Sequence, residues 1–415
     1  MAPRLEQAAL DYRALDLKPF YAGALVRFMG GFHRVADPAR QDPPCAAAAA
    51  DALVWLPRGR LVMLVDLLAV SGHLVDGLAS LPNPVGSPAD KLLVGLYRLK
   101  ALLGTPDAIL REDETSILAA LRAEGFSEAI IDRFFRPFLG GIFFDRSLGT
   151  TSRLLKFVMR MLATGENCLP SRGIGAVADQ LAAGLPAGAL RLGAKVEKVT
   201  PAQGAASPVV ALAGGESIKA KAVVVGVEGP EAQRLLGSAL SAAPSKPPPG
   251  VGTACLYFAA PRPARPGNVL YLDGEGGRLI NNMCFPSEVS STYAPQGQAL
   301  VSISTIGTHD ELSDGDLEAA VRREAGEWFG AAEVAAWRHL RTYRIPFAQP
   351  NQAPPTDLFR PVALGSGLYV CGDHRCSATL DGALKSGRLA AEAVIAALQQ
   401  QQRQPAVAAA ATAGR

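Results

Sequence analysis

The chain has 415 residues, of which 49% are hydrophobic and 19% are charged. This composition is typical of a globular protein, and the length indicates more than one domain. The net charge of +3 comes from basic residues spread along the chain, so we expect no nucleic-acid partner. The most apolar stretch, residues 52–70, is interrupted by Arg58, Arg60 and Asp66, so we expect no transmembrane segment. The six cysteines lack the paired spacing of a zinc site, and we expect no metal.

The N-terminal part combines a predicted hairpin with an unusual stretch. Residues 24–35, ALVRFMGGFHRV, predict a β-hairpin whose Gly30-Gly31 pair supplies the tight turn. We assign residues 1–42 to a partial substrate-domain hairpin. Residues 43–78 open with an alanine tract and show no clear period, and we interpret them as an insertion. A buried helical hairpin is the alternative interpretation of the same stretch.

Residues 79–164 predict the helical part of a substrate domain. In the first helix the apolar positions fall on one face, at residues 92, 93, 96, 99, 102 and 103. Gly125 is placed to end the next helix, while Ser127 and Ser152 are placed to cap the two that follow. Five phenylalanines in this region either line an apolar tunnel or form core packing: Phe134, Phe135, Phe138, Phe143 and Phe144.

The pattern changes to strands after residue 165. We interpret residues 165–243 and 355–400 as two parts of one α/β domain. Residues 244–354 predict an antiparallel sheet, with one helix capped by Ser313, that interrupts this domain. The tail at residues 401–415 is of low complexity, and we expect it to be disordered.

The C-terminal segment carries the most informative motif. A short apolar run, LYVC at residues 368–371, stops at Gly372-Asp373, and a helix follows from about Leu380. Gly372 lets a ligand approach the backbone, and the Asp373 carboxylate can accept hydrogen bonds from sugar hydroxyls at the carboxyl edge of the sheet. The helix N-terminus suits a phosphate or a polar ring edge. Alternatively, this is an ordinary strand–turn–helix in which Asp373 is a cap.

Two residues directly after this aspartate leave alternatives open. His374-Arg375 could touch a phosphate or a substrate. Arg375 could equally be a structural partner of Asp373. The sequence does not decide between these roles.

Several separated blocks resemble one family. LYVCGD at residues 368–373, SATLDGALKSGRLAAEAV at 377–394, LPSRGIGAVADQLAAGLP at 169–186 and the block at 125–158 are similar to the flavin-containing amine oxidase superfamily. That superfamily includes phytoene desaturases and protoporphyrinogen oxidases, and the blocks resemble its plant and algal branch. The resemblance covers most of residues 9–42 and 79–400. It implies an α/β, Rossmann-type FAD/NAD(P)-binding domain like that of glutathione reductase, with an inserted α+β substrate domain.

The resemblance also implies a cofactor and its site. The cofactor is FAD, held by the portion at residues 165–243 and the C-terminal FAD-binding segment at 355–400. The implied cofactor-binding residues are Val196, on the strand that lines the adenine side, Gly372, Asp373, Thr379, Leu380, Asp381 and Gly382. The implied reaction is hydride transfer from an apolar or amine small-molecule substrate to flavin, with oxygen or a quinone as the acceptor. We name no catalytic acid or base. The resemblance implies a plastid location, although no transit peptide is predicted; the alternative location is the cytoplasm.

One departure from the family limits this interpretation. The family opens with a βαβ unit that carries G-x-G-x-x-G, whose backbone receives the FAD pyrophosphate. The near match here, Gly173 to Ala178, follows residues 167–172, which predict a loop rather than a strand. We therefore expect the domain to be truncated at its N-terminus. A truncated, cofactor-free, non-enzymatic member of the fold is the alternative function, and an NAD-dependent dehydrogenase, which needs the same motif, ranks last.

Overall fold

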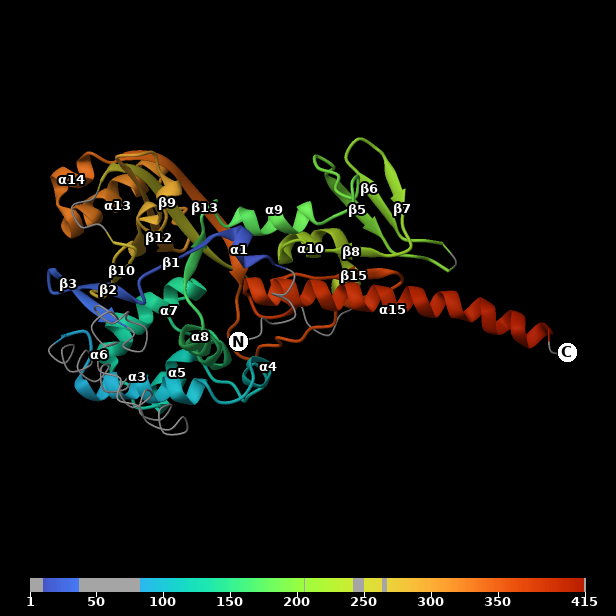
Figure 1. Ribbon diagram of the computed structural model, residues 1–415, viewed down its shortest axis with the longest axis horizontal. Helices are drawn as coiled ribbons and strands as arrows, with labels where there is room; N and C mark the ends of the chain where they lie inside the picture. The colour runs from blue at the N-terminus through green and yellow to red at the C-terminus, as the bar shows by residue number, and fades with distance from the viewer. Residues whose placement is uncertain (1–9, 37–82, 205, 242–249, 263–266, 414–415) are drawn as a thin grey trace, which may run out of the picture. The chain divides into compact units, whose positions relative to one another are not determined.

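The computed structural model describes residues 10–36, 83–204, 206–241, 250–262 and 267–413 (Figure 1). The chain forms two compact units. Unit 1 comprises residues 1–14, 175–251 and 347–415, and unit 2 comprises residues 15–174 and 252–346. The sequence led us to place these boundaries near residues 165, 244 and 355. The predicted insertion at residues 43–78 lies outside the described residues and stays a prediction.

Unit 2 is built on a seven-stranded sheet in the order β13-β9-β12-β11-β10-β2-β3. Its strands are β2 (Gly23–Phe28), β3 (Gly31–Ala36), β9 (Gly250–Pro261), β10 (Leu270–Asp273), β11 (Ile280–Cys284), β12 (Gln298–Ile306) and β13 (Arg338–Pro350). The β10–β2 pair is parallel, whereas β2–β3, β10–β11, β11–β12 and β12–β9 are antiparallel. The antiparallel sheet predicted between residues 244 and 354 is therefore confirmed, and the N-terminal hairpin extends it.

The hairpin forms as predicted, but its turn is shifted by one residue. Met29 and Gly30 both adopt positive φ, +51° and +71°, whereas Gly31 begins β3. Two consecutive positive φ values are typical of a type I′ turn, whose twist matches that of the flanking strands. Gly30 can supply one of these conformations at no steric cost, and Met29 supplies the other.

Burial alternates along the strands of this sheet, so its two faces differ. In β9 and β12 the buried residues alternate with half-buried ones, so one face packs into the core. Helix α13 (Asp314–Phe329) packs against this face through Leu317, Val321 and Trp328 (Figure 1). Ser313 caps α13 by accepting a hydrogen bond from the Asp316 N–H, as predicted. The short helix α14 (Ala331–Ala335) completes this layer.

The remaining elements of unit 2 are mostly helical. They are β1 (Leu17–Pro19), α3 (Pro88–Ala101), α4 (Pro106–Ile109), α5 (Ile117–Ala123), α6 (Glu128–Ile130), η3 (Ile131–Phe135), α7 (Arg136–Phe143), α8 (Ser152–Thr164), β4 (Cys168–Pro170), α12 (Pro286–Val289) and η4 (Ser291–Tyr293). Ser127 caps α6 and Gly125 ends α5 with φ +89°, both as predicted. Thr151, rather than the predicted Ser152, caps α8, because the helix begins one residue earlier than expected.

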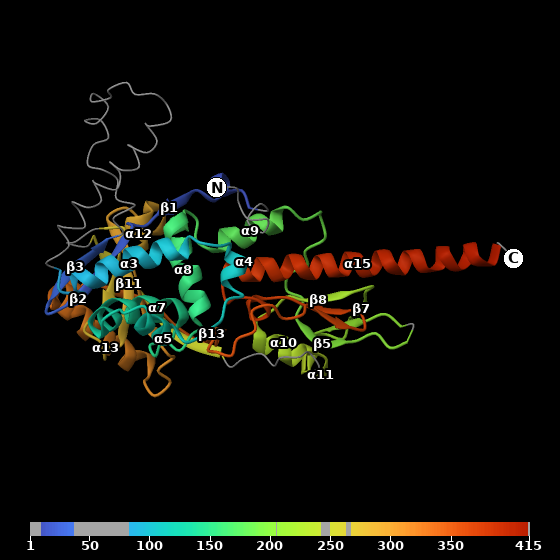
Figure 2. The same ribbon diagram turned by 90° about the horizontal axis from the view of Figure 1, so that it is seen from below.

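Helix α3 forms as predicted, but its apolar face does not pack. Its buried residues are Asp90, Tyr97 and Ala101, on the side that lies beside α8 (Figure 2). The leucines of the predicted apolar face are exposed or only partly covered. The Asp90 carboxylate fixes the orientation of the helix, because it accepts hydrogen bonds from the backbone N–H and hydroxyl groups of both Ser87 and Ser127.

The phenylalanines that follow belong to the core rather than to a tunnel. Phe135 and Phe143 are buried, and Phe134 stacks on Phe138 with ring centroids 5.3 Å apart. Phe134 and Phe138 pack against a small cluster that includes Val26. The structure therefore supports the core-packing interpretation over the tunnel.

Unit 1 contains two small sheets and several helices. Its elements are α9 (Gly175–Ala183), β5 (Val196–Thr200), β6 (Val209–Leu212), β7 (Ser217–Lys219), β8 (Val223–Val225), α10 (Gly229–Leu236), α11 (Ser238–Ser241), β14 (Ala363–Gly365), β15 (Leu368–Val370), η5 (Asp373–Arg375) and α15 (Leu380–Ala413), with α1 (Tyr12–Leu15) at the boundary. One sheet has the order β14-β15-β8, and the other is the antiparallel meander β5-β6-β7. Strand β15 is the middle strand of its sheet, parallel to β8 and antiparallel to β14.

Helix α15 packs through small residues rather than through the predicted apolar positions. Its fully buried residues are Gly382, Ser386 and Ala390, spaced by four along one face. The sequence predicts five apolar anchoring positions in this helix, Leu384, Ala391, Val394, Ile395 and Leu398. Of these, Ala391 and Ile395 are exposed and the other three are only partly buried. Small side chains let the helix backbone approach β15 and η5 closely. The helix continues to Ala413 and so includes most of the tail expected to be disordered, whose alanines and glutamines favour helix.

The near match to the dinucleotide motif also differs from the prediction. Residues 168–170 form strand β4 rather than a loop, and α9 begins at Gly175. However, β4 pairs antiparallel with β1 in a two-stranded sheet. A dinucleotide-binding βαβ unit needs parallel strands, so this stretch is not that unit.

Candidate functional site

The turn after β15 is built around a glycine. Gly372 has φ +143°, and a Cβ there would lie 2.6 Å from the His374 ring and 3.3 Å from the Val227 carbonyl oxygen. Its N–H donates to Ser386 Oγ at 2.8 Å, and the Ser386 hydroxyl lies 2.9 Å from the Gly372 carbonyl oxygen. Only glycine fits this position without displacing its neighbours. The strand end is thereby held against the first turns of α15.

Asp373 lies at the start of η5, directly after this glycine. Its side chain is 30% exposed, and its Oδ1 lies 3.8 Å from His374 Nδ1. This distance is too long for a hydrogen bond. The carboxylate therefore remains open to hydroxyl donors, as the predicted sugar-binding role requires, and that role stays a prediction.

The start of α15 is fixed by close packing. A Cβ on Gly382 would lie 2.0 Å from the Ser377 carbonyl oxygen, so this position also requires glycine. The Gly382 N–H donates to Thr379 Oγ1 at 2.9 Å. Leu380 is 54% exposed, and Asp381 occupies the first helical turn beside it. The structure therefore brings Gly372, Asp373 and residues 379–382 together around one strand–turn–helix.

Beneath this turn lie buried side chains whose hydrogen-bonding groups are not fully paired. Arg375 is fully buried, and its Nη2 donates to the Pro361 carbonyl oxygen, whereas its Nε and Nη1 have no hydrogen-bond partner among the described residues. His374 is 2% exposed, and within the described part of the chain neither ring nitrogen has a partner. Burial, followed by repulsion from Arg360, lowers the pKa of Arg375 to about 10.

Arg360 extends this cationic cluster. Its backbone N–H donates to the Arg375 carbonyl oxygen at 3.0 Å, and its Nη1 donates to the His374 carbonyl oxygen at 3.2 Å. Burial also lowers the pKa of the Arg360 guanidinium. Backbone ties thus hold two guanidinium groups near each other despite their repulsion. We call the Arg360 and Arg375 guanidinium groups, with the His374 imidazole beside them, the cationic cluster.

The hydrogen-bonding groups of the cationic cluster show whether this segment fits a flavin nucleotide. Buried donors without partners cost free energy, and a buried charge costs more unless an opposite charge or acceptor compensates it. A nucleotide cofactor brings anionic phosphates and several acceptor oxygens. The orphaned donors of His374 and Arg375, together with the open Asp373 carboxylate, fit such a group.

The predicted adenine-side residue lies on a different sheet of unit 1. Val196 is the first residue of β5, pairs with Leu212 and is partly buried against the core cluster of that unit. Its side chain therefore lies beside hydrophobic residues at the start of the strand. Its contact with the cofactor stays a prediction.

Unit 2 carries an apolar groove on the face of its sheet away from α13. The groove has a volume of about 500 Å³ and is lined by Cys255, Tyr257, Leu300, Leu340, Arg341, Tyr343 and Ile345. Tyr257 and Tyr343 meet edge-to-face, with ring centroids 5.9 Å apart. Arg341 lies over the Tyr343 ring at 4.9 Å and is the one charged residue in the lining. The groove offers an apolar surface with a single cation.

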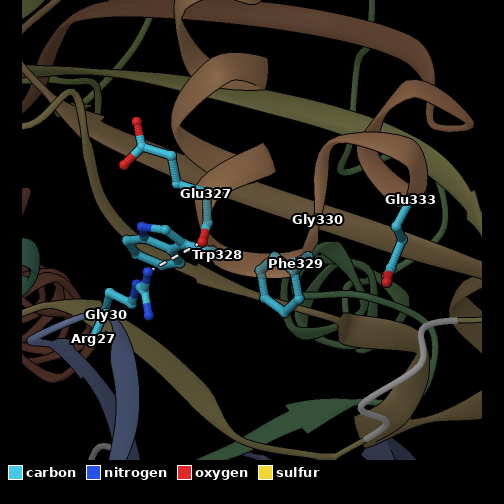
Figure 3. A pocket seen from close by; sticks show the side chains of 7 residues that line it. All are labelled: Arg27, Gly30, Glu327, Trp328, Phe329, Gly330 and Glu333. Atoms are coloured by element: carbon cyan, nitrogen blue, oxygen red, sulfur yellow. Dashed lines mark hydrogen bonds between the residues drawn. The ribbon is translucent and has the colours of Figure 1, made fainter.

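A second cavity of unit 2 is polar (Figure 3). It has a volume of about 310 Å³ between the β2–β3 hairpin and the α13–α14 junction. Arg27 Nη2 donates to the Glu327 carbonyl oxygen at 3.1 Å, which ties the hairpin to the end of α13. Glu327 also forms an ion pair with Arg278. These contacts explain the cavity as part of the packing of unit 2.

Sequence reasoning missed two contributors to the site. Arg360 precedes Arg375 by 15 residues in a loop region with no periodic pattern, so nothing in the sequence predicted their proximity. Ser386, in contrast, left a signal, because it is a polar residue on the buried face of a helix. Such a residue commonly bonds a backbone group nearby, and here it bonds Gly372.

Within the ranges that the structure describes, no three His, Cys, Asp or Glu side chains are grouped as metal ligands. In the same part of the chain, no helix is long and apolar enough to cross a membrane.

Comparison with known proteins identifies the family. The model of flavin containing amine oxidoreductases matches residues 48–395. No curated protein sequence matches the chain. Among solved structures, putrescine oxidase bound to putrescine has a TM-score of 0.54 and is 12% identical, over 95% of this chain and 87% of that one.

Two other similar structures cover less of the chain. A protein from Exiguobacterium sp. 255-15, named as a protoporphyrinogen oxidase, has a TM-score of 0.55 and 15% identity, over 75% of this chain and 73% of its own. An oxidoreductase from Methanosarcina mazei has a TM-score of 0.52 and 16% identity over the same shares. These likenesses confirm the expected α/β oxidoreductase fold. Because the family model spans most of the sequence, this chain belongs to the flavin-containing amine oxidoreductase family.

Proposed function

We propose that this protein is an FAD-dependent oxidoreductase that takes an apolar substrate rather than an amine. The observation that carries the cofactor proposal is the Gly372–Asp373 turn above the buried, partly unpaired donors of His374 and Arg375. When bound, the flavin supplies the redox chemistry by accepting a hydride, and the protein supplies position and electrostatics. The substrate is thereby oxidised by two electrons.

Each residue of the segment has a defined task in this proposal. The Asp373 carboxylate accepts hydrogen bonds from hydroxyls of the cofactor's sugar chain. The cationic cluster compensates the negative charge of the phosphates. Gly372 and Gly382 let the turn and the helix pack without side chains in the way. Thr379 fixes the first turn of α15 through the Gly382 N–H.

The lining of the apolar groove supports an apolar substrate. Among the described residues, the lining holds no carboxylate that could pair with a protonated amine, and the Arg341 guanidinium would repel it. The tyrosines and aliphatic residues instead offer contact area to a hydrocarbon. Oxygen or a quinone as the acceptor of the reducing equivalents, a phytoene desaturase-like substrate and the plastid location stay predictions.

The test is the visible spectrum of the full-length protein after incubation with FAD and gel filtration. We expect a retained flavin band in the wild type. We expect at least a tenfold weaker FAD affinity in Asp373→Ala and an intermediate loss in Asp373→Asn, which keeps one acceptor oxygen. Glu392→Gln, an exposed change on the same helix, is the matched control and is expected to bind as wild type.

Two outcomes would contradict the proposal. A folded wild-type protein that elutes colourless supports the alternative, a cofactor-free member of the family. Equal retention of FAD by wild type and Asp373→Ala would show that the cofactor binds elsewhere. If FAD is retained, anaerobic bleaching of the flavin band by putrescine, but not by an apolar polyene, would overturn the substrate class.

A further inference from the structure

The large sheet of unit 2 carries a group of uncharged polar side chains on the face away from α13. The strand register places them in two adjacent rows across β9, β12 and β11. All of them are partly buried and none is charged, whereas Lys, Glu, Arg and Asp are the residues that usually face water. We call these six residues the polar patch: Tyr257, Ser302 and Cys284 in one row, and Cys255, Ser304 and Asn282 in the next.

The polar patch is covered on one side and open on the other. On the β11 side, helix α7 approaches it closely, because a Cβ on Gly141 would lie 2.9 Å from Asn282 Oδ1. The same oxygen accepts a hydrogen bond from Asn281 Nδ2 at 2.9 Å. On the β9 side, Cys255 and Tyr257 also line the apolar groove. The polar patch is therefore continuous with the groove, and a molecule bound in the groove can reach it.

Hydrogen bonds link members of the polar patch into a chain that ends at the groove. Ser304 Oγ donates to Cys255 Sγ at 3.9 Å, and Cys255 Sγ lies 3.7 Å from Ser302 Oγ. The Tyr257 hydroxyl hydrogen-bonds to the Cys255 thiol and to the Ser302 hydroxyl. A thiol is a weak donor and a weak acceptor. The hydroxyl groups around Cys255 therefore keep hydrogen-bonding capacity for a stronger partner.

Tyr257 is the member of the chain best placed to meet a ligand. Its ring lines the groove and contacts the Tyr343 ring edge-to-face, which fixes its position. Burial, followed by the Cys255 thiol, raises the pKa of Tyr257 to about 12, so the phenol keeps its proton at neutral pH. A protonated phenol donates a hydrogen bond to an oxygen lone pair and brings no charge into the groove.

From this arrangement, we propose that the groove binds an apolar molecule that carries one neutral oxygen, a carbonyl or a hydroxyl, and that Tyr257 holds this oxygen. That the bound molecule is the substrate rests on the proposed function, but its binding does not require FAD. Leu300, Leu340 and Ile345 contact the hydrocarbon part. Tyr257 is thus a specificity-determining residue, because a hydrocarbon without oxygen leaves its hydroxyl with the weak thiol as a partner.

The alternative ligand is a carboxylate paired with Arg341. The Arg341 side chain is exposed, so water competes for its guanidinium and an ion pair there contributes little. The polar patch is partly buried, and hydrogen bonds are stronger where water is excluded. These surroundings favour the neutral oxygen over the carboxylate.

The test compares three small molecules that share one carbon skeleton: benzylacetone, which has a carbonyl, its alcohol, and butylbenzene, which has no oxygen. Dissociation constants are measured by titration calorimetry on the full-length protein without added FAD. We expect Tyr257→Phe to weaken binding of the ketone and the alcohol about fivefold and to leave butylbenzene unchanged. Tyr97→Phe removes the hydroxyl of another buried tyrosine of unit 2, outside the groove, and should bind all three as wild type.

Three results would overturn this proposal. One is a wild type that does not bind benzylacetone. Another is equal weakening of benzylacetone and butylbenzene by Tyr257→Phe, since this would be general damage to the groove. The third is phenylbutyrate binding more tightly than benzylacetone, with the difference lost in Arg341→Met, which would assign the groove to a carboxylate. These measurements do not depend on FAD retention, so the proposed function and the role of Tyr257 can fail separately.

Discussion

Asp90 in unit 2 and Arg375 in unit 1 are both buried charged side chains, but their surroundings are opposite. The Asp90 carboxylate receives four hydrogen bonds from the backbone and hydroxyl groups of Ser87 and Ser127. The Arg375 guanidinium donates to one carbonyl oxygen, is repelled by the Arg360 guanidinium and is attracted more weakly by the Asp357 carboxylate. A fully satisfied buried charge fixes a structure, whereas an unsatisfied one is costly, which is why we propose that a bound cofactor supplies the missing partner of Arg375.

The largest expected effect is at the satisfied charge. Asp90→Ala leaves the backbone donors of Ser87 and Ser127 without their acceptor inside unit 2. We expect a loss of about 3 kcal/mol in the free energy of unfolding, measured by urea denaturation. Asp132→Ala is the control, because Asp132 forms an exposed ion pair with Arg136 that contributes about 0.5 kcal/mol or less. Equal losses of unfolding free energy in Asp90→Ala and Asp132→Ala would contradict the structural role assigned to the Asp90 hydrogen bonds.

Next in size is the effect of a methyl group at the start of α15. Gly382→Ala places a Cβ against the Ser377 carbonyl oxygen, so we expect a loss of about 2 kcal/mol and weaker FAD binding. Gly387→Ala on the same helix meets no atom within 4 Å and is expected to gain about 0.5 kcal/mol through helix propensity. Thermal unfolding measures whether Gly382→Ala is destabilised and Gly387→Ala is stabilised. A Gly382→Ala protein as stable as wild type would contradict the close packing described here.

A smaller effect depends on pH. Burial alone would raise the pKa of Asp90, but the hydrogen bonds from Ser87 and Ser127 together hold it below its ordinary value of 3.8. Its contribution to stability is therefore present above about pH 4 and is lost as the pH falls through the lowered pKa of the folded state. Asp90→Asn, which cannot titrate, should show a shallower loss of stability between pH 5 and 2 by about 1 kcal/mol. Parallel acid-unfolding curves for wild type and Asp90→Asn would contradict this.

The smallest expected effect on stability is at the unsatisfied charge. Arg375→Met keeps the length of the side chain but removes a charge whose burial is poorly compensated. We expect the free energy of unfolding without FAD to change by less than about 1 kcal/mol, or to rise. Urea denaturation of the FAD-free protein measures it. A loss as large as that of Asp90→Ala would mean that Arg375 is a structural anchor.

The sequence predicted where helices and strands form better than it predicted which of their sides pack into the core. The antiparallel sheet was correctly predicted within residues 244–354, and Ser127 and Ser313 were correctly assigned as caps. The apolar period of α3 identified the helix but not the side that packs, because the hydrogen bonds of Asp90 decide that side.

In the candidate site, too, the local motif was predicted but the contacts between distant residues were not. Gly372 and Asp373 were predicted from a local motif, since strand, turn and helix follow one another in the chain. The cationic cluster could not be fully predicted, because Arg360 reaches Arg375 only through the folding of a loop without periodicity. Likewise, the buried face of α15 consists of small residues that hydrophobic periodicity overlooks.

The most direct test of this account is the dissociation constant of FAD for wild type and Arg375→Met, measured by quenching of flavin fluorescence in the full-length protein. Because the cationic cluster compensates the phosphates, we predict at least tenfold weaker binding by Arg375→Met at unchanged stability, and equal binding of riboflavin, which carries no phosphate, by both proteins. Equal affinities of wild type and Arg375→Met for FAD would contradict the claim that the unpaired donors of the C-terminal segment bind the cofactor.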